Sequence, residues 1–444
     1  MKARAGIAFL VAAGSLIAGL ATGDDLFFNM AYLWLGVLAL SWAWSRLALR
    51  GVRLHRHPRG LVSQVGLVQE ETLILENRSA FPKLWIEVRD ESDLPGRWAS
   101  ARTLDFGVGR RKPGSDAEFL GHRASGVAVG LGARQEWIWS ARTICTRRGR
   151  YQLGPATLHA SDPFGFFPVH AAGSGSRPVV VLPLAVPLSS FPLPSGRITG
   201  GEALRRRTYQ VTPNAAGVRD YAPGDALNRI HWPSTARRER LIAKEFELDP
   251  MADAWLVLDG NTRAHYQRVG EVSAWQEAGQ LPSSTEEYMV AAAASIARYI
   301  LRRNRSLGLV AYGRSRHVIQ ADRGEPQLTR VLESLAVFQA EGSADLTDVL
   351  KVEAPWIARG STLILITPGT RPDLLTQAGE LRRRGLLVVF VLIDPKTFGG
   401  PLSSDGMARA AERASFPVRV VRCHEPLAPA LAQAGSPTRF NVAA

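Results

Sequence analysis

Thr362-Leu-Ile-Leu-Ile-Thr367 is a run in which four aliphatic residues stand between two threonines without a charged side chain. A strand that is apolar on both faces is typical of a parallel sheet covered by helices on both sides. Four other runs repeat this pattern, at Trp255–Asp259, Leu307–Tyr312, Leu386–Ile393 and Val418–Val421. We expect these runs to be the strands of one sheet.

The segments between these runs have the spacing of helices. In the first of them, apolar residues recur every three or four positions, at Met289, Ala293, Ile296 and Ile300. The expected helices are Glu286–Asn304, Gln327–Phe338 and Pro372–Arg384, the last of which ends at Gly385. Strands that alternate with helices predict an α/β domain with a doubly wound sheet.

Ligands of such sheets bind beyond the carboxyl ends of the strands. The positions to examine for a site are Asp259–Arg263, Gly342–Thr347, Thr367–Thr370 and Asp394. The chain contains no GxxxxGK[ST] phosphate loop, no HExxH zinc motif and no GxSxG nucleophile elbow. The absence of these motifs argues against P-loop nucleotide hydrolysis, zinc-protease chemistry and α/β-hydrolase chemistry.

Two apolar runs stand at the N-terminus. Ala5–Thr22 has no charged residue, and its length of roughly 18 residues makes a helix of about 27 Å, close to the thickness of a bilayer core. Asp24 and Asp25 end this run, and Leu26–Ser45 is a second apolar run. We therefore predict a transmembrane helical hairpin within residues 1–50. The alternatives are a cleaved signal peptide that ends near Ala21 and a buried core hairpin.

The flanking charges predict how this hairpin is oriented. Lys2 and Arg4 precede the first run. Five arginines follow the second run, at Arg46, Arg50, Arg53, Arg56 and Arg59. The loop between the runs carries only acidic charge, so the positive-inside rule places both termini and the soluble domains in the cytoplasm, below a bacterial inner membrane that the chain crosses twice. The arginines are also expected to contact anionic membrane lipid.

The middle of the chain has the pattern of an antiparallel β-sandwich. Short β-branched or aromatic runs are separated by Gly, Pro, Asn, Asp and Ser, as in a chain of hairpins. The expected strands are Leu73–Leu75, Leu84–Val88, Gly126–Val129, Glu136–Trp139, Arg150–Leu153 and Val179–Leu182. We expect four parts: the hairpin (1–50), a β-sandwich-like domain (51–194), a linking segment (195–250) and the α/β domain (251–444).

Composition narrows the function classes. The net charge is +14, from 54 Lys and Arg against 40 Asp and Glu, but neither a nucleic-acid-binding module nor aromatic residues interleaved with the basic ones are found, so no nucleic-acid partner is expected. Cys145 and Cys423 lie far apart in the sequence. Two such cysteines predict neither a disulfide framework nor a zinc site.

The linking segment contains the most unusual stretch, Gly217–Arg237, which crowds charged and aromatic residues around Pro223-Gly224. Its candidate binding or structural residues are Arg219, Asp220, Tyr221, Gly224, Asp225, Arg229, Trp232 and Arg237. One interpretation is a structural clasp between the β and α/β domains, in which Arg–Asp pairs fix the geometry. The other is a docking or anion-binding surface. We favour the clasp.

Three stretches together resemble the bacterial domain of unknown function 58 family. They are Thr146–Pro155 with Asp162-Pro-Phe-Gly165, Gly217–Asp225 with Ile230, Trp232, Ala236 and Arg237, and Lys244-Glu-Phe246. The resemblance covers most of the chain from Gly51 onward. It implies an α/β domain similar to von Willebrand factor A, no established enzymatic activity, and association with MoxR-type AAA+ ATPases and other proteins with von Willebrand A domains.

The resemblance also implies a place for a metal-ion-dependent adhesion site, which needs Asp-x-Ser-x-Ser after the first strand and Thr-Asp-Gly after a later one. This chain has Asp259-Gly-Asn-Thr-Arg263 and Thr367-Pro-Gly369. Arg263 puts a cation where a ligand is needed, and Pro368 has no donor atom. Since Mg²⁺ needs an almost complete octahedron of oxygen ligands, the prediction is a degenerate site at Asp259 and Asn261, with no metal and no cofactor.

The sequence thus predicts a non-enzymatic, membrane-anchored adaptor or chaperone-like assembly factor that works with a MoxR-type AAA+ ATPase or its client. The alternative is a hydrolase or anionic-ligand-binding protein that uses Asp220, Asp225 and His231 in a cleft between domains, since carboxylates and a histidine can serve as acid and base. A third hypothesis is a protein that binds anionic lipid or a cell-wall precursor.

Overall fold

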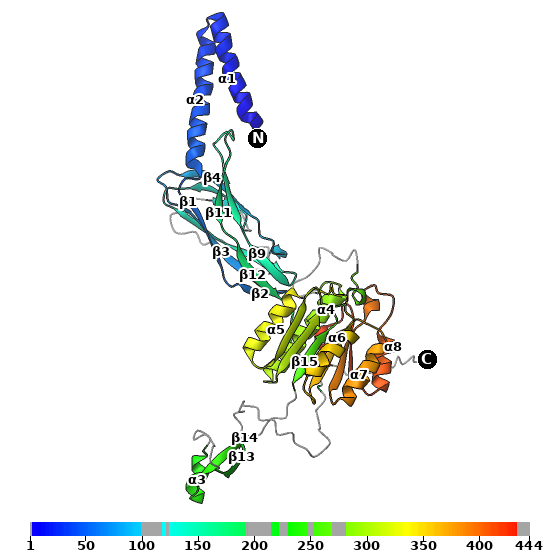
Figure 1. Cartoon of the computed structure of the whole chain (residues 1–444). Helices are drawn as coiled ribbons and strands as arrows, with labels where there is room; N and C mark the ends of the chain where they lie inside the picture. Colours follow the sequence, from blue (N-terminus) through cyan, green and yellow to red (C-terminus); the bar gives the residue numbers. More distant parts are fainter. Residues whose placement is uncertain are drawn as a thin grey trace, which may run out of the picture.

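The structure is a computed structural model of the chain. It describes residues 2–98, 118–120, 124–191, 193, 215–221, 230–246, 253–268 and 281–432. A helical hairpin, a β domain and an α/β domain follow one another along the long axis of the molecule, and a small unit made of β13, α3 and β14 stands apart from them (Figure 1).

The hairpin consists of α1 (Lys2–Thr22) and α2 (Asp25–Ala48). The Asp24 side chain begins the second helix, because it accepts a hydrogen bond of 2.9 Å from the Leu26 amide. Both helices are long and apolar enough to cross a membrane, and only 22% and 17% of their apolar windows are buried. Large side chains such as Leu10 and Leu20, each 73% exposed, point away from the protein. The hairpin is therefore not the core of a soluble domain.

The β domain is built from two sheets that share one core. The first sheet has the order β1 (Val52–Pro58), β3 (Val68–Asn77), β8 (Glu136–Cys145) and β5 (Gly96–Trp98). The second has the order β11 (Val169–Ser174), β10 (Ala156–Ala160), β4 (Lys83–Asp90), β7 (Gly126–Leu131) and β6 (Glu118–Leu120). Leu73 and Trp139 from the first sheet pack with Ile86 and Leu158 from the second.

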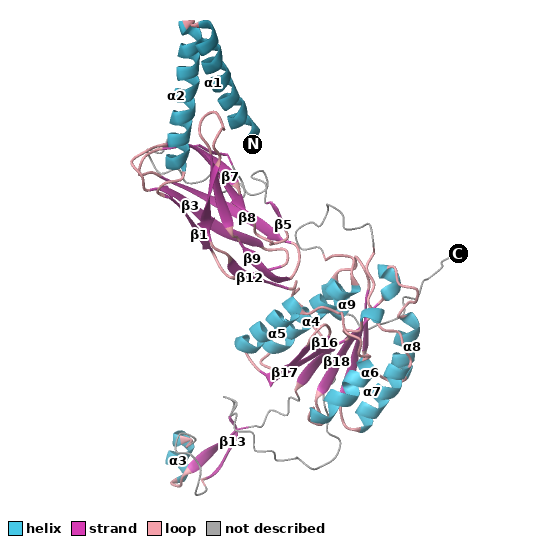
Figure 2. Ribbon diagram, turned by 45° about the horizontal axis from the view of Figure 1, so that its top comes forward, coloured by secondary structure: helices cyan, strands magenta, loops and turns pink. Residues whose placement is uncertain are grey.

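A third, smaller sheet lies at the end of the β domain nearest the α/β domain (Figure 2). Its order is β2 (Val62–Gln64), β12 (Arg177–Leu182) and β9 (Gly149–Leu153). All six strands expected in this region lie within observed strands. The strands β1, β2, β5, β6, β10 and β11 were not predicted from the sequence.

The α/β domain has a six-stranded sheet. Its order is β17 (Arg316–Asp322), β16 (Leu307–Tyr312), β15 (Ala254–Leu258), β18 (Thr362–Thr367), β19 (Leu387–Ile393) and β20 (Val418–Val421). Five strands are parallel, as expected, and β17 is antiparallel to β16. The expectation of a purely parallel sheet missed this edge strand, because its polar ends and half-buried middle lack the continuous apolar run of the others.

Helices cover both faces of this sheet (Figure 2). One face packs against α4 (Thr285–Arg302), α5 (Glu325–Val337) and α9 (Leu427–Ala432). The other packs against α6 (Leu346–Glu353), α7 (Asp373–Arg383) and α8 (Asp405–Arg413). Short 3-10 turns are η2 (Thr262–Ala264), η3 (Ala354–Trp356) and η4 (Pro395–Phe398). The predicted helices correspond to α4, α5 and α7.

The segment after β12 packs on the α/β domain. Ala185 and Phe191 belong to the core beneath α4, and the Val186 amide donates a hydrogen bond of 3.0 Å to Ser295 Oγ on that helix. The Phe191 ring meets Tyr299 edge to face. By packing, the β domain therefore ends near Leu182, earlier than the expected boundary at residue 194.

The small unit holds the described part of the linking segment, and we call it the signature unit (residues 215–221 and 230–246). Antiparallel strands β13 (Ala215–Asp220) and β14 (Ile242–Phe246) pair, and α3 (Trp232–Arg238) precedes β14. Among the residues whose burial the structure describes, Ile230 is 4% exposed and Ile242 is fully buried. In Figures 1 and 2 the unit lies away from the other domains.

Candidate functional site

A pocket of about 290 Å³ opens at the carboxyl end of the α/β sheet. It lies where β15 and β18 stand side by side and the chain leaves them toward opposite edges, which is the switch point of a doubly wound sheet. Its wall includes Asp259, Asn261, Arg263, Asp345, Thr367, Pro368 and Arg371. The expected loops at 259–263, 342–347 and 367–370 therefore meet here. Asp394 is instead buried beside the pocket and accepts a hydrogen bond from the Ser404 amide.

Asp259 lies at the floor of the pocket and is only 5% exposed. One carboxylate oxygen accepts a hydrogen bond of 2.6 Å from the Thr367 hydroxyl, and the other accepts one of 3.1 Å from the Asn261 amide. Burial raises the pKa of Asp259, and the nearby negative charge of Asp345 acts in the same direction. The carboxyl group is thus held by the protein itself and favours its neutral form.

A second set of polar contacts lies along the rim of this pocket. Asn261 Nδ2 donates to one oxygen of Asp345 at 2.6 Å, and Arg371 donates to the other at 2.6 Å. Asn261 Oδ1 accepts from the Arg263 amide at 3.0 Å. Asp345 lies within the expected loop 342–347, but the sequence does not single it out, because the helix α6 that follows it was not expected.

The donor set of this pocket does not fit a divalent cation. The Asn261 oxygen and both Asp259 oxygens already accept hydrogen bonds within the protein. The guanidinium of Arg263 lines the pocket, is exposed, and makes no hydrogen bond or ion pair with the residues that the structure describes. Within the same residues, no three His, Cys, Asp or Glu side chains come together as a metal-binding group. The arrangement suits a neutral or anionic group better than Mg²⁺.

We expect Asp259→Asn to leave the fold intact and to remove the part of the pH dependence of stability that this carboxyl causes. A carboxyl whose folded pKa is raised stabilises the fold below its unfolded pKa, and this contribution is lost as pH rises through the folded pKa. The amide cannot ionise, so thermal unfolding of both proteins across this range should diverge as pH rises. Stability curves of the two proteins that stay parallel across this pH range would contradict a raised pKa of Asp259.

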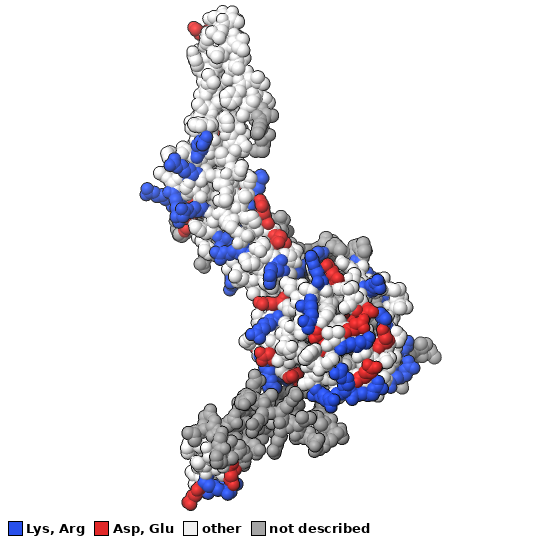
Figure 3. Space-filling view, in the orientation of Figure 1, with Lys and Arg blue, Asp and Glu red and all other residues white. Residues whose placement is uncertain are grey.

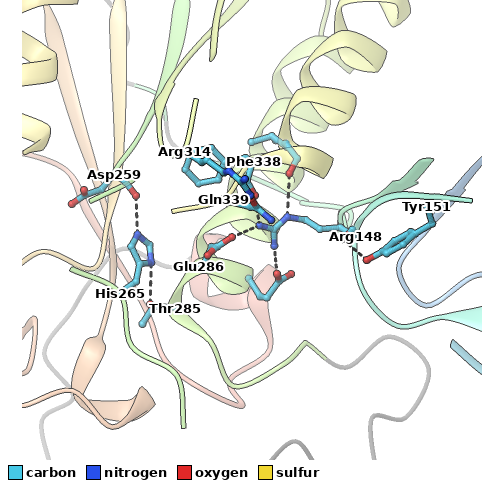
Figure 4. A network of polar contacts seen from close by, with 11 residues as sticks. Arg148, Tyr151, Asp259, His265, Thr285, Glu286, Arg314, Phe338 and Gln339 are labelled. Carbon is cyan, nitrogen blue, oxygen red and sulfur yellow. Dashed lines mark hydrogen bonds and ion pairs between the residues drawn. The ribbon is translucent and has the colours of Figure 1, made fainter. Parts of the chain in front are cut away.

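His265 contacts the backbone of the loop that forms the floor of the pocket. One ring nitrogen lies 2.8 Å from the Asp259 carbonyl oxygen and the other 3.1 Å from the Thr285 hydroxyl (Figure 4). It therefore ties the loop after β15 to the first turn of α4. Sequence reasoning missed this histidine, since no motif surrounds it.

A second polar cluster joins the two large domains. Arg148, between β8 and β9, has a side chain only 4% exposed and forms ion pairs with Glu286, at 2.6 Å, and Glu287 of α4. It also donates hydrogen bonds of 3.1 and 2.8 Å to the carbonyl oxygens of Leu335 and Phe338 at the end of α5 (Figure 4). Arg148 belongs to one of the stretches that carry the family resemblance, but the sequence alone gives it no role.

The signature unit places its residues differently from the expected clasp. Asp220 forms a 3.1 Å ion pair with Arg240, and both side chains are 59% exposed. Trp232 is 63% exposed, and Arg237 is also exposed. Arg219 and Tyr221 lie on and just after β13. Gly224, Asp225 and Arg229 lie outside the described residues.

The interface between the large domains is therefore made by Arg148 and the segment after β12. The described residues of the signature unit stand apart from this interface in both views, and the expected clasp stays a prediction, because Gly224, Asp225 and Arg229 lie outside the described residues.

His231 has a structural part in this unit. Its Nδ1 atom caps α3 by accepting from the Ser234 amide at 3.2 Å, and it lies 2.8 Å from the Ser234 hydroxyl. Asp220 is paired with Arg240 on the surface. Neither of these two side chains lines the pockets described here, so no observation favours the hydrolase alternative.

Residues 217–409 match the family described as "Protein of unknown function DUF58". The chain is 24% identical over 139 residues to "Uncharacterized protein YeaD" of Bacillus subtilis (strain 168), which covers 31% of this chain and 30% of that protein. The match thus spans less than a third of its relative's length.

Among solved structures, the chain is similar to proximal thread matrix protein 1 from the mussel byssus, with a TM-score of 0.29, 11% identity, and coverage of 41% of this chain and 46% of that one. It is also similar to the conserved hypothetical protein BatB from Bacteroides thetaiotaomicron, with a TM-score of 0.24, 13% identity, and coverage of 32% and 67%.

Proposed function

On the premise that residues 217–409 match a family of unknown function, we propose that this chain is a non-enzymatic adaptor or chaperone-like assembly factor. Its hairpin anchors it in the bacterial inner membrane, with both termini and the soluble domains in the cytoplasm. There it docks a MoxR-type AAA+ ATPase, or the client of that ATPase, and works beside proteins with von Willebrand A domains. The partner class and the von Willebrand A likeness rest on the sequence resemblance.

The observation that carries this proposal is the exposure of the signature unit. Its Trp232 is 63% exposed beside the exposed arginines Arg237 and Arg238. Tryptophan and arginine are the side chains most enriched at the energetic centres of protein interfaces. An indole ring exposed to water contributes little to folding, so a partner surface accounts for the position of Trp232 better than folding does.

The pocket at Asp259 supports a binding role for the α/β domain as well. Burial raises the pKa of its Asp259 carboxyl, which Thr367 holds, while Arg263 on its wall has no partner among the described residues. Leu402 on the same wall is 62% exposed. A partner side chain with an apolar stem and a polar or acidic end fits such a lining.

The test is co-purification of the tagged full chain from detergent-solubilised native membranes, with and without nucleotide. We expect a MoxR-type AAA+ ATPase in the eluate of the native chain, identified by mass spectrometry. Trp232→Ala should lower its recovery about tenfold or more, because interface tryptophans commonly contribute 2 kcal/mol or above.

The matched control is Trp356→Ala. Trp356 is 84% exposed on the α/β domain, far from the signature unit in sequence, and its loss should leave recovery unchanged. Absence of any AAA+ protein from the native chain's eluate would overturn the proposed partner. Equal loss in both variants would show that the signature unit is not the docking surface.

A further inference from the structure

A second pocket, of about 310 Å³, lies at the junction of the hairpin and the β domain. It is lined by Leu47, Arg50, Gly51, Ser79, Ala80, Phe81 and Lys83. Leu47 belongs to the last turn of α2, the second apolar helix. The pocket therefore opens where the chain leaves the apolar hairpin, which is the level of lipid headgroups if the hairpin spans a bilayer.

Lys83 is the unusual residue of this pocket. It is only 3% exposed, and its ammonium donates a hydrogen bond of 2.6 Å to the Leu47 carbonyl oxygen at the end of α2. No carboxylate pairs with it in the part of the chain that the structure describes. Burial lowers the pKa of Lys83. A buried ammonium without a counter-ion is costly, and an anion in the pocket would remove that cost.

Arg50 adds a second cation to the same wall. Its side chain is exposed and has no hydrogen bond or ion pair with described residues. Lysine and arginine side chains also gather on the surface at the foot of the hairpin (Figure 3). Two converging donors of positive charge are the usual recognition elements for a phosphate group.

The rim of the pocket is apolar on the side of the hairpin. Phe81, on the pocket wall, is 57% exposed. On α2, the Arg46 guanidinium lies 5.2 Å from the centre of the Trp42 ring, an arrangement suited to a membrane interface. A ligand with a charged head and an apolar tail matches this combination.

We propose that this pocket binds the phosphate headgroup of an anionic phospholipid, with Lys83 and Arg50 donating to its oxygens and Phe81 contacting its acyl chains. The inference rests on the membrane anchoring proposed above. It adds a defined lipid site to the general attraction of a basic segment for an anionic bilayer.

The experiment uses the full chain in a non-ionic detergent, titrated with phosphatidylglycerol or phosphatidylcholine and followed by native mass spectrometry. We expect one phosphatidylglycerol to bind in preference to phosphatidylcholine. Arg50→Ala should weaken that binding about tenfold, as for loss of one charge-assisted contact. The control Arg53→Ala removes an equal charge three residues away, outside the pocket wall, and should change it by less than about twofold.

A second variant keeps the net charge and fills the space. Ala80 is exposed on the pocket wall, so Ala80→Trp should block the lipid as strongly as Arg50→Ala does. Equal weakening by Arg50→Ala and Arg53→Ala, or unchanged binding in Ala80→Trp, would overturn the site. Inorganic phosphate alone should not displace the lipid, and displacement by millimolar phosphate would assign the pocket to a soluble ion.

Flotation with phosphatidylcholine vesicles separates this inference from the anchoring itself. The native chain, Arg50→Ala and Ala80→Trp should all float, because the apolar hairpin is unchanged. A chain that does not float refutes the anchoring. A chain that floats but shows no preference for phosphatidylglycerol refutes the lipid site alone.

Discussion

Arg148→Met is expected to destabilise the chain by about 3–5 kcal/mol and to loosen the β domain from the α/β domain. The substitution leaves Glu286 and Glu287 without their cation. It also removes the donors to the carbonyl oxygens of Leu335 and Phe338. Denaturant unfolding of the detergent-solubilised chain measures the loss, and small-angle scattering should show a longer particle.

Two further variants make the interpretation of this result unambiguous. Arg147→Met removes an exposed neighbouring arginine and should leave both measurements unchanged. Combining Arg148→Met with Glu286→Gln and Glu287→Gln should recover part of the lost stability, since the carboxylates are no longer left unpaired. If Arg148→Met alone unfolds like the native chain, the ion pairs do not hold the domains together.

Gly260→Ala is the second change with a large expected effect. A Cβ atom at this position would lie 1.8 Å from the carbonyl oxygen of Tyr312 and 2.8 Å from Cα of Gly313. Both are backbone atoms, so no side chain can rotate away, and the loop after β15 must separate from the end of β16. We expect a loss of about 3 kcal/mol or more and a disordered Asp259 pocket.

Gly379→Ala serves as the matched control. Gly379 lies within α7, and a Cβ atom there would meet nothing within 4 Å. Alanine should therefore leave stability unchanged or raise it by up to about 1 kcal/mol. Thermal unfolding of the two variants gives the comparison. A Gly260→Ala protein as stable as the Gly379→Ala protein would mean that the loop relaxes freely.

The sequence predicts best those elements whose apolar residues form a continuous run or recur at a regular spacing. Val418–Val421 and Thr362–Thr367 are strands with the expected bounds, because a buried parallel strand is a continuous apolar run. Edge strands such as β17, and short helices such as α6 and α8, escaped prediction. Their residues are held by neighbours in space, and half-exposed segments carry a weak pattern.

The candidate sites also differ in how far the sequence predicts them. The meeting of the loops after Asp259 and Thr367 follows from sheet topology and was predicted. The contact of Arg148 with α4 was not, because it joins residues 138 positions apart that belong to different domains. The buried Lys83 without a carboxylate likewise becomes visible only when the end of α2 is placed beside β4.

The packing of residues 184–191 on α4 has a consequence for the integrity of the chain. The β domain is already attached to the α/β domain before the polypeptide reaches the signature unit, through Arg148 and through Phe191 against Tyr299. A protease cut between residues 193 and 253 would therefore convert the protein into two polypeptides that remain together as a heterodimer. Removal of the signature unit could thus end docking while the membrane-bound scaffold stays assembled.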